Sequence, residues 1–124
     1  MRTPEGIPGF DESREWALER SHPEAVFCLL RPQDAPDRGI LVAEPWQLAP
    51  GYEPDLPEAE LERISITGPE DVELYVVVTL TPERTTVFLN LAAPIVVHRT
   101  ERLARQVILD RQGWPLRHAV EARG

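Results

Sequence analysis

The apolar run at residues 85–97 constrains the fold of this chain more than any other segment, because it contains Asn90 and Pro94. Proline has no backbone N–H to donate to a sheet ladder, so it is excluded from the interior of a central strand. The sequence therefore predicts that the run breaks at residues 92–94 into two strands. The side chain of Asn90 can hydrogen-bond backbone groups at the bend, and we expect a structural role for it there.

Proline is frequent along the whole chain. The 124 residues include 13 prolines, spread from Pro4 to Pro115, which is roughly twice the average usage. This spacing leaves no room for a long helix and indicates short elements joined by turns. A chain of this length fits one domain, and we expect residues 1–124 to form one.

The pattern of apolar residues predicts an all-β fold, a meander of antiparallel strands with one short helix inserted. Apolar and polar positions alternate at residues 73–80, which is typical of a half-buried strand. A four-residue turn is expected at 81–84, with proline in its second place. Residues 57–64 predict the helix, since proline and acids suit a first turn. The other predicted strands occupy residues 16–18, 25–30, 40–43, 85–91, 94–98 and 103–109.

The negative charge of the chain is concentrated in one segment. The formal net charge is −8, and residues 44–73 contain nine acids and one arginine. The rest of the chain contains 12 acids and 12 arginines. The acidic segment is either a solvated helix and loop or a face that steers a basic protein partner. This balance disfavours direct binding to nucleic acid.

The residues that could carry chemistry form no recognisable catalytic or metal motif. His22, His98 and His118 are far apart and have no Cys or His neighbour at ligand spacing, so only a composite metal site from distant strands stays open. His98 is expected to end a strand and His118 to lie in an exposed tail. Cys28, the only cysteine, lies in an apolar run and is expected to be buried. We expect no cofactor, no metal and no catalysis.

The sequence also predicts where the protein works. The N-terminal residues lack the apolar core of a signal peptide. The longest apolar run is too short to cross a bilayer, so no membrane contact is expected. A single cysteine allows no disulfide within the chain, and a reducing cytoplasm is the expected location.

A short segment near the N-terminus combines two glycines with a proline. Residues 6–10 read Gly-Ile-Pro-Gly-Phe, and the glycines permit a tight turn that fixes Ile7 relative to Phe10. The turn either fastens the N-terminus onto the core through Phe10 or presents Ile7, Pro8 and Phe10 as an apolar corner for a partner.

Five blocks in order, spanning nearly the whole chain, resemble the flagellar assembly factor FliW family. The first is Pro-Glu-Gly-Ile-Pro-Gly-Phe at residues 4–10, and the second is Tyr-Glu-Pro-Asp-Leu-Pro at residues 52–57. The third, Pro-Glu-Asp-Val, occupies residues 69–72. The most telling block is the opening feature itself, at residues 87–97. The last combines residues 105–109 with Trp-Pro-Leu-Arg-His at residues 114–118, where the family usually has tyrosine in place of Trp114.

The resemblance implies a small, partly open β-barrel-like domain that acts by binding proteins in the cytoplasm. Members of this family bind flagellin, and when free of it they bind the translational regulator CsrA and relieve its repression of flagellin mRNA. The antagonism would be allosteric, because it acts away from the RNA-binding surface of CsrA. An acidic chain suits such a basic, RNA-binding partner. The candidate partner-binding residues are Ile7, Pro8, Phe10, Asp55, Glu58, Glu60, Glu62 and Asn90.

One departure from the family pattern concerns the N-terminus. Family members begin with further strand sequence, whereas five residues precede Gly6 here. The resemblance therefore implies an N-terminal edge strand that is missing or shortened, and an open sheet edge favours self-association. Two other functions stay open: a flagellin chaperone or adaptor that does not bind CsrA, and a small enzyme that uses paired carboxylates.

Overall fold

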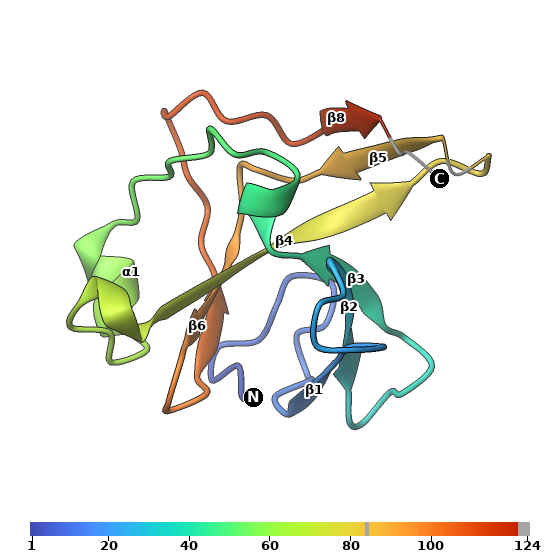
Figure 1. Ribbon diagram of the computed structural model, residues 1–124. Helices are drawn as coiled ribbons and strands as arrows, with labels where there is room; N and C mark the ends of the chain where they lie inside the picture. Colours follow the sequence, from blue (N-terminus) through green and yellow to red (C-terminus); the bar gives the residue numbers. More distant parts are fainter. Residues whose placement is uncertain (84, 122–124) are drawn as a thin grey trace.

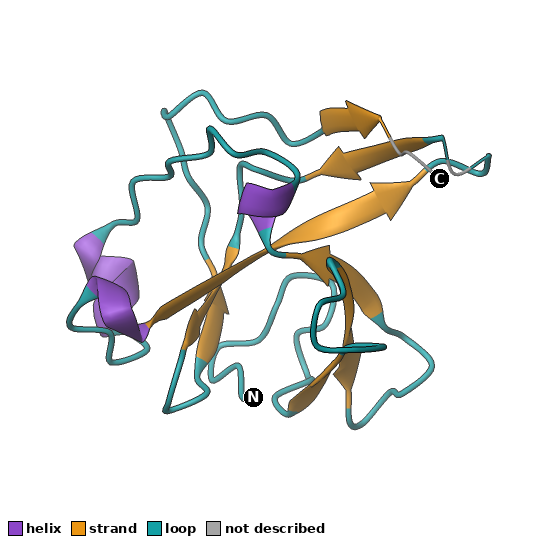
Figure 2. Cartoon of the chain, viewed as in Figure 1, coloured by secondary structure: helices purple, strands orange, loops and turns teal. Residues whose placement is uncertain are grey.

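The computed structural model describes residues 1–83 and 85–121, and its strands form one eight-stranded antiparallel sheet (Figure 1). The all-β prediction is confirmed. Helix is confined to α1 (Glu58–Glu62) and two short 3-10 turns, η1 (Pro45–Gln47) and η2 (Pro69–Asp71), as Figure 2 shows. The strands are β1 (Trp16–Glu19), β2 (Phe27–Pro32), β3 (Ile40–Ala43), β4 (Val72–Leu80), β5 (Thr86–Leu89), β6 (Ile95–His98), β7 (Ala104–Gln106) and β8 (His118–Glu121).

Strand β4 is the centre of the sheet and crosses the whole molecule in Figure 1. It pairs with β3, β5 and β6, and the main path runs β1-β2-β3-β4-β5-β8. Strand β6 leaves this path and pairs with β4 and β7. The predicted meander therefore holds from β1 to β5 and again from β6 to β7, whereas β6 returns to β4 and β8 returns to β5.

The break at residues 92–94 is confirmed. Strands β5 and β6 both pair with β4, in the registers Val78↔Leu89 and Tyr75↔Ile95. Residues 75–78 of β4 therefore lie opposite residues 89–95, which end β5 and begin β6. The second segment is the longer one, and its extra residues form the bend. The Asn90 side-chain oxygen accepts hydrogen bonds from the N–H groups of residues 92 and 93, each at 3.1 Å, so it satisfies the backbone that the bend frees.

Strand β4 is buried on both faces at its middle, which corrects the prediction of one buried face. Leu74, Val76 and Val78 belong to one core cluster, together with Leu89 and Leu91. The second cluster lies on the other face and contains Tyr75, Trp16, Cys28, Ile95 and Val97, among others. The alternating pattern failed here because Tyr75 is amphipathic: its ring is buried while its hydroxyl makes polar contacts.

Residues 1–3 lie in the gap between the chain before β1 and the chain before β7. Arg2 forms an antiparallel bridge with Glu15 and a parallel bridge with Leu103. The hydroxyl of Thr3, which is fully buried, accepts a hydrogen bond from the Trp16 indole N–H at 2.9 Å. The N-terminal segment thus bridges the chain directly before β1 and the chain directly before β7, although it is too short to form a strand.

Three local predictions need correction. The helix is shorter than residues 57–64, because Pro57 stands outside it as N-cap and Arg63 ends it. The predicted strand at 103–109 has a ladder only over β7, although the N–H groups of Val107 and Leu109 still donate to the bend, at Pro94 and Ala92. His118 begins β8 and is not in an exposed tail.

Other expectations are met or fall outside the description. His98 ends β6, and Cys28 is buried, as predicted. The predicted turn at 81–84 includes Arg84, which lies outside the described residues. In the part of the chain that the structure describes, no helix has the length and apolar character needed to cross a membrane.

Candidate functional site

The turn at residues 6–10 fastens the N-terminus to the core. Gly6 and Gly9 have φ values of 77° and 88°, which favour glycine. Ile7 is only 2% exposed, and the ring of Phe10 packs edge-on against Trp16 with centroids 5.4 Å apart. Of the three candidate residues here, Ile7 is a core residue and Phe10 is half-buried, whereas Pro8 is exposed.

The acidic segment divides into two groups of carboxylates. Four acids are held by polar contacts: Glu44 by Arg20, Glu60 by Arg105, Asp71 by Thr67, and Glu73 by Arg102. Five are exposed and form no ion pair with any described residue: Glu53, Asp55, Glu58, Glu62 and Glu70. The uncompensated charge therefore surrounds α1 and the loops on either side of it.

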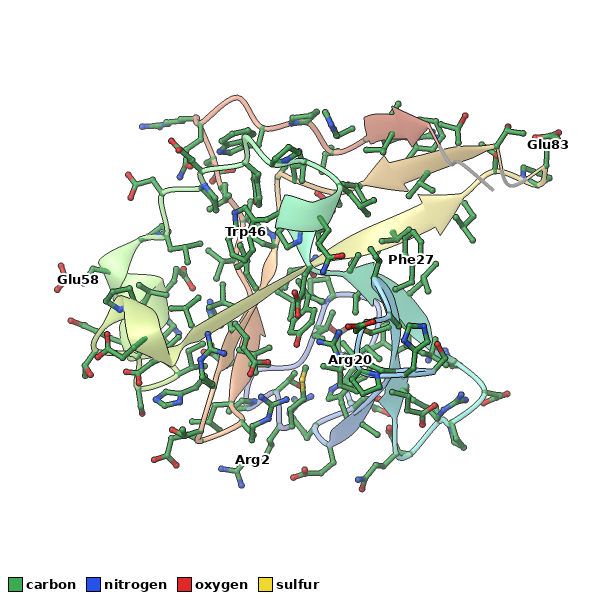
Figure 3. The ribbon with its side chains drawn as sticks, viewed as in Figure 1. Arg2, Arg20, Phe27, Trp46, Glu58 and Glu83 are labelled. Atoms are coloured by element: carbon green, nitrogen blue, oxygen red, sulfur yellow. The ribbon has the colours of Figure 1, made fainter. Side chains whose placement is uncertain are left out.

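A groove of about 550 Å³ lies beside α1. We call it the α1 groove, and its lining residues are Pro54, Leu56, Glu58, Leu61, Glu62, Ile66, Thr67, Gly68, Pro69 and Val72. Its apolar residues pack against the first core cluster, whereas Glu58 and Glu62 are exposed. Figure 3 shows Glu58 pointing from α1 into solvent. Two of the acids predicted as site residues, Glu58 and Glu62, line this groove, and its apolar lining comes from Leu61 of the helix and from the chain on both sides of it.

Three other predicted site residues have polar groups that are already bonded within the protein. Glu60 is half-buried and bonded to Arg105, which also pairs with Glu5 at 2.7 Å. The backbone of Asp55 is clasped by the side-chain amide of Gln112, which accepts from its N–H at 3.0 Å and donates to its carbonyl at 2.7 Å. Asn90 lies at the bend between β5 and β6, where its oxygen is already bonded to the backbone.

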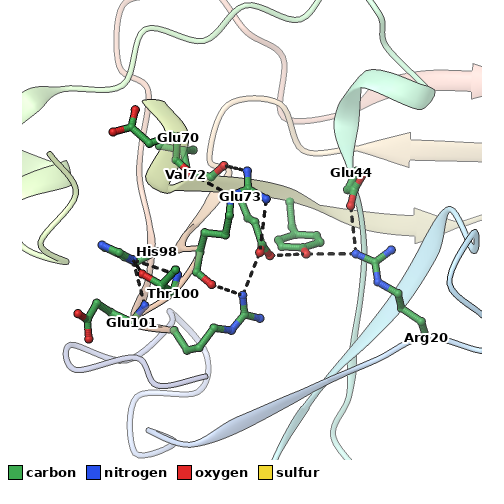
Figure 4. Close-up of polar contacts among 11 residues, drawn as sticks. Arg20, Glu44, Glu70, Val72, Glu73, His98, Thr100 and Glu101 are labelled. Carbon is green, nitrogen blue, oxygen red and sulfur yellow. Dashed lines mark hydrogen bonds and ion pairs between the residues drawn. The ribbon is translucent and has the colours of Figure 1, made fainter. Parts of the chain in front are cut away.

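A partly buried polar network, which the sequence did not reveal, surrounds the Tyr75 hydroxyl (Figure 4). The Tyr75 hydroxyl donates to Glu73 at 2.9 Å and accepts from Arg20 at 3.2 Å. Arg20 also pairs with Glu44, and Glu73 pairs with Arg102, each at 3.0 Å. Burial, followed by the bond to Glu73, raises the pKa of Tyr75 to about 12. This network joins the chain after β1 to the turn before β7.

His98 has a structural environment. Its Nδ1 accepts hydrogen bonds from the backbone N–H groups of Thr100 and Glu101, at 3.3 and 3.1 Å, so the ring proton lies on Nε2. Nε2 faces Asp71 at 3.9 Å. The pKa of Asp71 is lowered, first by the hydrogen bond from the Thr67 backbone. These contacts order the turn before β7.

Groups suited to catalysis are not gathered at one place in the described structure. Within residues 1–83 and 85–121, His, Cys, Asp and Glu form no group of three or more that could hold a metal. Burial raises the pKa of the Cys28 thiol, which makes it a poor nucleophile. The α1 groove holds carboxylates without a second kind of reactive side chain. Its chemistry is that of a docking surface for an apolar segment with basic side chains.

These features define a small all-β domain with a groove lined by apolar residues and exposed acids, and comparisons with known proteins show its family. The family model described as "FliW protein" matches residues 1–120. The chain belongs to the FliW family of flagellar assembly factors. The family prediction made from the five sequence blocks is thereby confirmed.

Individual relatives agree over most of the chain. The flagellar assembly factor FliW of Geobacillus thermodenitrificans is 36% identical over 118 residues, which cover 95% of this chain and 81% of the relative. That of Syntrophus aciditrophicus is 34% identical over 115 residues, covering 93% and 73%. A crystal structure of the flagellar assembly factor FliW superposes with a TM-score of 0.88 at 38% identity, over 94% of this chain and 82% of that one.

Proposed function

We propose that this protein binds flagellin and, when free of flagellin, binds CsrA and relieves its repression of flagellin mRNA translation. Family membership supports a role in flagellar assembly. The observation that carries the proposal is the α1 groove, where an apolar lining lies beside exposed acids. In this proposal the protein is cytoplasmic, acts as one domain without catalysis or cofactor, and contacts neither nucleic acid nor membrane.

The charge distribution suits the proposed exchange of partners. An RNA-binding regulator is basic, and complementary fields raise the rate of association and exclude acidic competitors. Binding flagellin and CsrA in turn requires only overlapping or coupled sites. The exposed candidate residues Pro8, Asp55, Glu58 and Glu62 stay proposed contacts, whereas Ile7, Phe10, Glu60 and Asn90 would act by shaping the surface.

The direct test is a translation assay with a flagellin mRNA leader repressed by CsrA. The purified protein should restore translation, and added flagellin should abolish this effect. Gel filtration should show a complex with each partner separately. If the protein gives no relief and forms neither complex, the proposal fails. A complex with flagellin alone selects the alternative function, a flagellin chaperone or adaptor without CsrA binding.

A charge-reversal pair tests the site. The double variant Glu58→Lys/Glu62→Lys should weaken CsrA binding by about tenfold, mostly through slower association at low salt. The matched control is Glu12→Lys/Glu24→Lys, which makes the same change in net charge at exposed acids outside the groove. Binding measured by surface plasmon resonance should be nearly unchanged in the control. Equal losses in both variants would show that net charge, and not the groove, drives binding.

A further inference from the structure

Strand β8 presents unpaired backbone. In the described part of the chain, β8 pairs with β5 alone. The Thr81 N–H donates to Thr86, and the Asn90 N–H donates to Val77, so even-numbered residues of β5 bond to β4. Antiparallel ladders alternate, and the odd-numbered Val87 and Leu89 therefore bond to Val120 and His118. The backbone N–H and C=O of Ala119 consequently point away from the sheet.

An apolar pocket opens at the start of the same strand. We call it the β8 pocket; it measures about 320 Å³ and is lined by Leu48, Ala49, Pro50, Gly51, Tyr52, Leu91, Trp114, Pro115 and His118. Tyr52 is held in place, because its hydroxyl donates to the Leu91 carbonyl at 2.7 Å and its ring packs edge-on against Trp114 at 4.7 Å. The pocket therefore has a rigid aromatic wall.

The surroundings of β8 are apolar and basic. Arg117, directly before the strand, is exposed, and its guanidinium lies 4.3 Å from the centre of the Phe88 ring on β5. Leu116 is 67% exposed. At the opposite end of the main strand path, residues 1–3 lie beside the chain before β1. One end of the sheet is therefore bridged by the chain itself, whereas β8 offers an edge, a pocket and a fixed positive charge together.

We propose that β8 is a docking edge for an extended peptide segment of another protein. The segment pairs with the outward N–H and C=O of Ala119, places one apolar side chain in the β8 pocket beside His118, and brings a carboxylate to Arg117. Strand addition of this kind takes affinity from backbone hydrogen bonds and specificity from side-chain pockets. The β8 pocket and the α1 groove share no lining residue, so this surface is additional to the one in the proposed function.

The experiment uses a phage-displayed library of short random peptides, selected on the wild-type protein. Selected peptides should share an apolar residue with Asp or Glu nearby. Ala119→Pro removes a donor that faces away from β5, so the β5–β8 ladder is kept. This substitution should weaken the binding of the selected peptides by about tenfold or more, since a carbonyl of the bound peptide then lacks its hydrogen-bond donor. Ala119→Thr, the matched control, retains the N–H and should retain binding.

A second variant and a localisation measurement complete the test. Arg117→Glu should weaken the binding of the acidic peptides, and it tests the proposal even if Ala119→Pro folds poorly. Circular dichroism measures whether each variant is folded. Bound peptide should slow hydrogen exchange of the Ala119 N–H and leave residues of the α1 groove unchanged. The proposal is overturned if no peptide is selected, or if selected peptides bind Ala119→Pro and Arg117→Glu as well as wild type. It is equally overturned if β8 pairs only with a second copy of this chain.

Discussion

Single polar side chains hold the irregular parts of this protein together. Asn90 bonds the backbone at the bend, Thr3 bonds the Trp16 indole, and His98 bonds the turn before β7. Among the described residues, no buried side-chain nitrogen or oxygen lacks a hydrogen-bond partner. Because an unpaired buried polar group costs more than a hydrogen bond gains, these residues are the sensitive positions.

Replacing Asn90 with alanine should destabilise the fold by about 1–3 kcal/mol, since two backbone N–H groups at the bend lose their acceptor. Asn90→Asp is the control, because it keeps an acceptor oxygen. Urea unfolding followed by tryptophan fluorescence measures the difference. An alanine variant as stable as wild type would mean that solvent replaces the side chain without cost.

Ionisation of Tyr75 makes the free energy of unfolding depend on pH in the alkaline range. Its pKa is raised from 10.0 to about 12 in the folded state, so between these values the folded protein retains a proton that the unfolded chain has lost. Its contribution is fully present below pH 10 and is lost as the pH rises toward 12. Tyr75→Phe should reduce this loss, measured by urea unfolding between neutral and alkaline pH. Identical pH dependence in both proteins would contradict the assignment.

Short elements of this protein depend on contacts from distant segments. The N-terminal residues 1–3 bridge two parts of the chain, and α1 has no buried residue and only five residues. A helix of this length is unstable by itself, so it persists through the packing of Leu61 and its neighbours. The N-terminal segment likewise depends on its bridges.

Substitutions at Thr3 test how much the N-terminal segment contributes to stability. Thr3→Val keeps the shape but leaves the Trp16 indole N–H, on a residue that is 1% exposed, without its acceptor. We expect a loss of about 1–3 kcal/mol in the free energy of unfolding, and little change for Thr3→Ser, which keeps the hydroxyl. Thermal unfolding followed by circular dichroism compares the two. Equal melting temperatures for both variants would show that the hydroxyl contact is dispensable.

The whole molecule has two apolar clusters on the two faces of one strand. Leu74, Val76 and Val78 of β4 enter one cluster and Tyr75 enters the other, so β4 contributes side chains to both clusters. The polar network around Tyr75 connects the same regions (Figure 4). This arrangement favours unfolding as one cooperative unit.

Calorimetry tests this cooperativity. Leu89→Ala in the first cluster and Ile95→Ala in the second remove side chains that are 0% exposed. Each should cost about 2–5 kcal/mol and lower the temperature of a single transition. Leu116→Ala, at a position that is 67% exposed, is the control and should change stability by less than about 0.5 kcal/mol. Two separate transitions in either core variant would refute the cooperative unit.

Local sequence was sufficient for features that depend on backbone chemistry. Pro94 cannot pair in a ladder, so the break between β5 and β6 was predictable, as were the role of Asn90 and the burial of Cys28. The acids of the candidate site were also visible, because charge is a property of composition. The four residues of β8 were missed, since so short a segment shows no alternation, and His118 was placed in a tail.

Tertiary structure decided the rest, because it depends on residues far apart in the chain. Which acids of residues 44–73 are neutralised follows from arginines up to 45 residues away, as for Glu60 and Arg105. In the β8 pocket, residues 48–52 meet Leu91 and Trp114, which lie far away in the sequence. The α1 groove, in contrast, is built within residues 54–72. The sequence alone therefore determined the all-β class, the bend and the family, whereas the sheet order, strand β8 and its pocket arose from long-range packing.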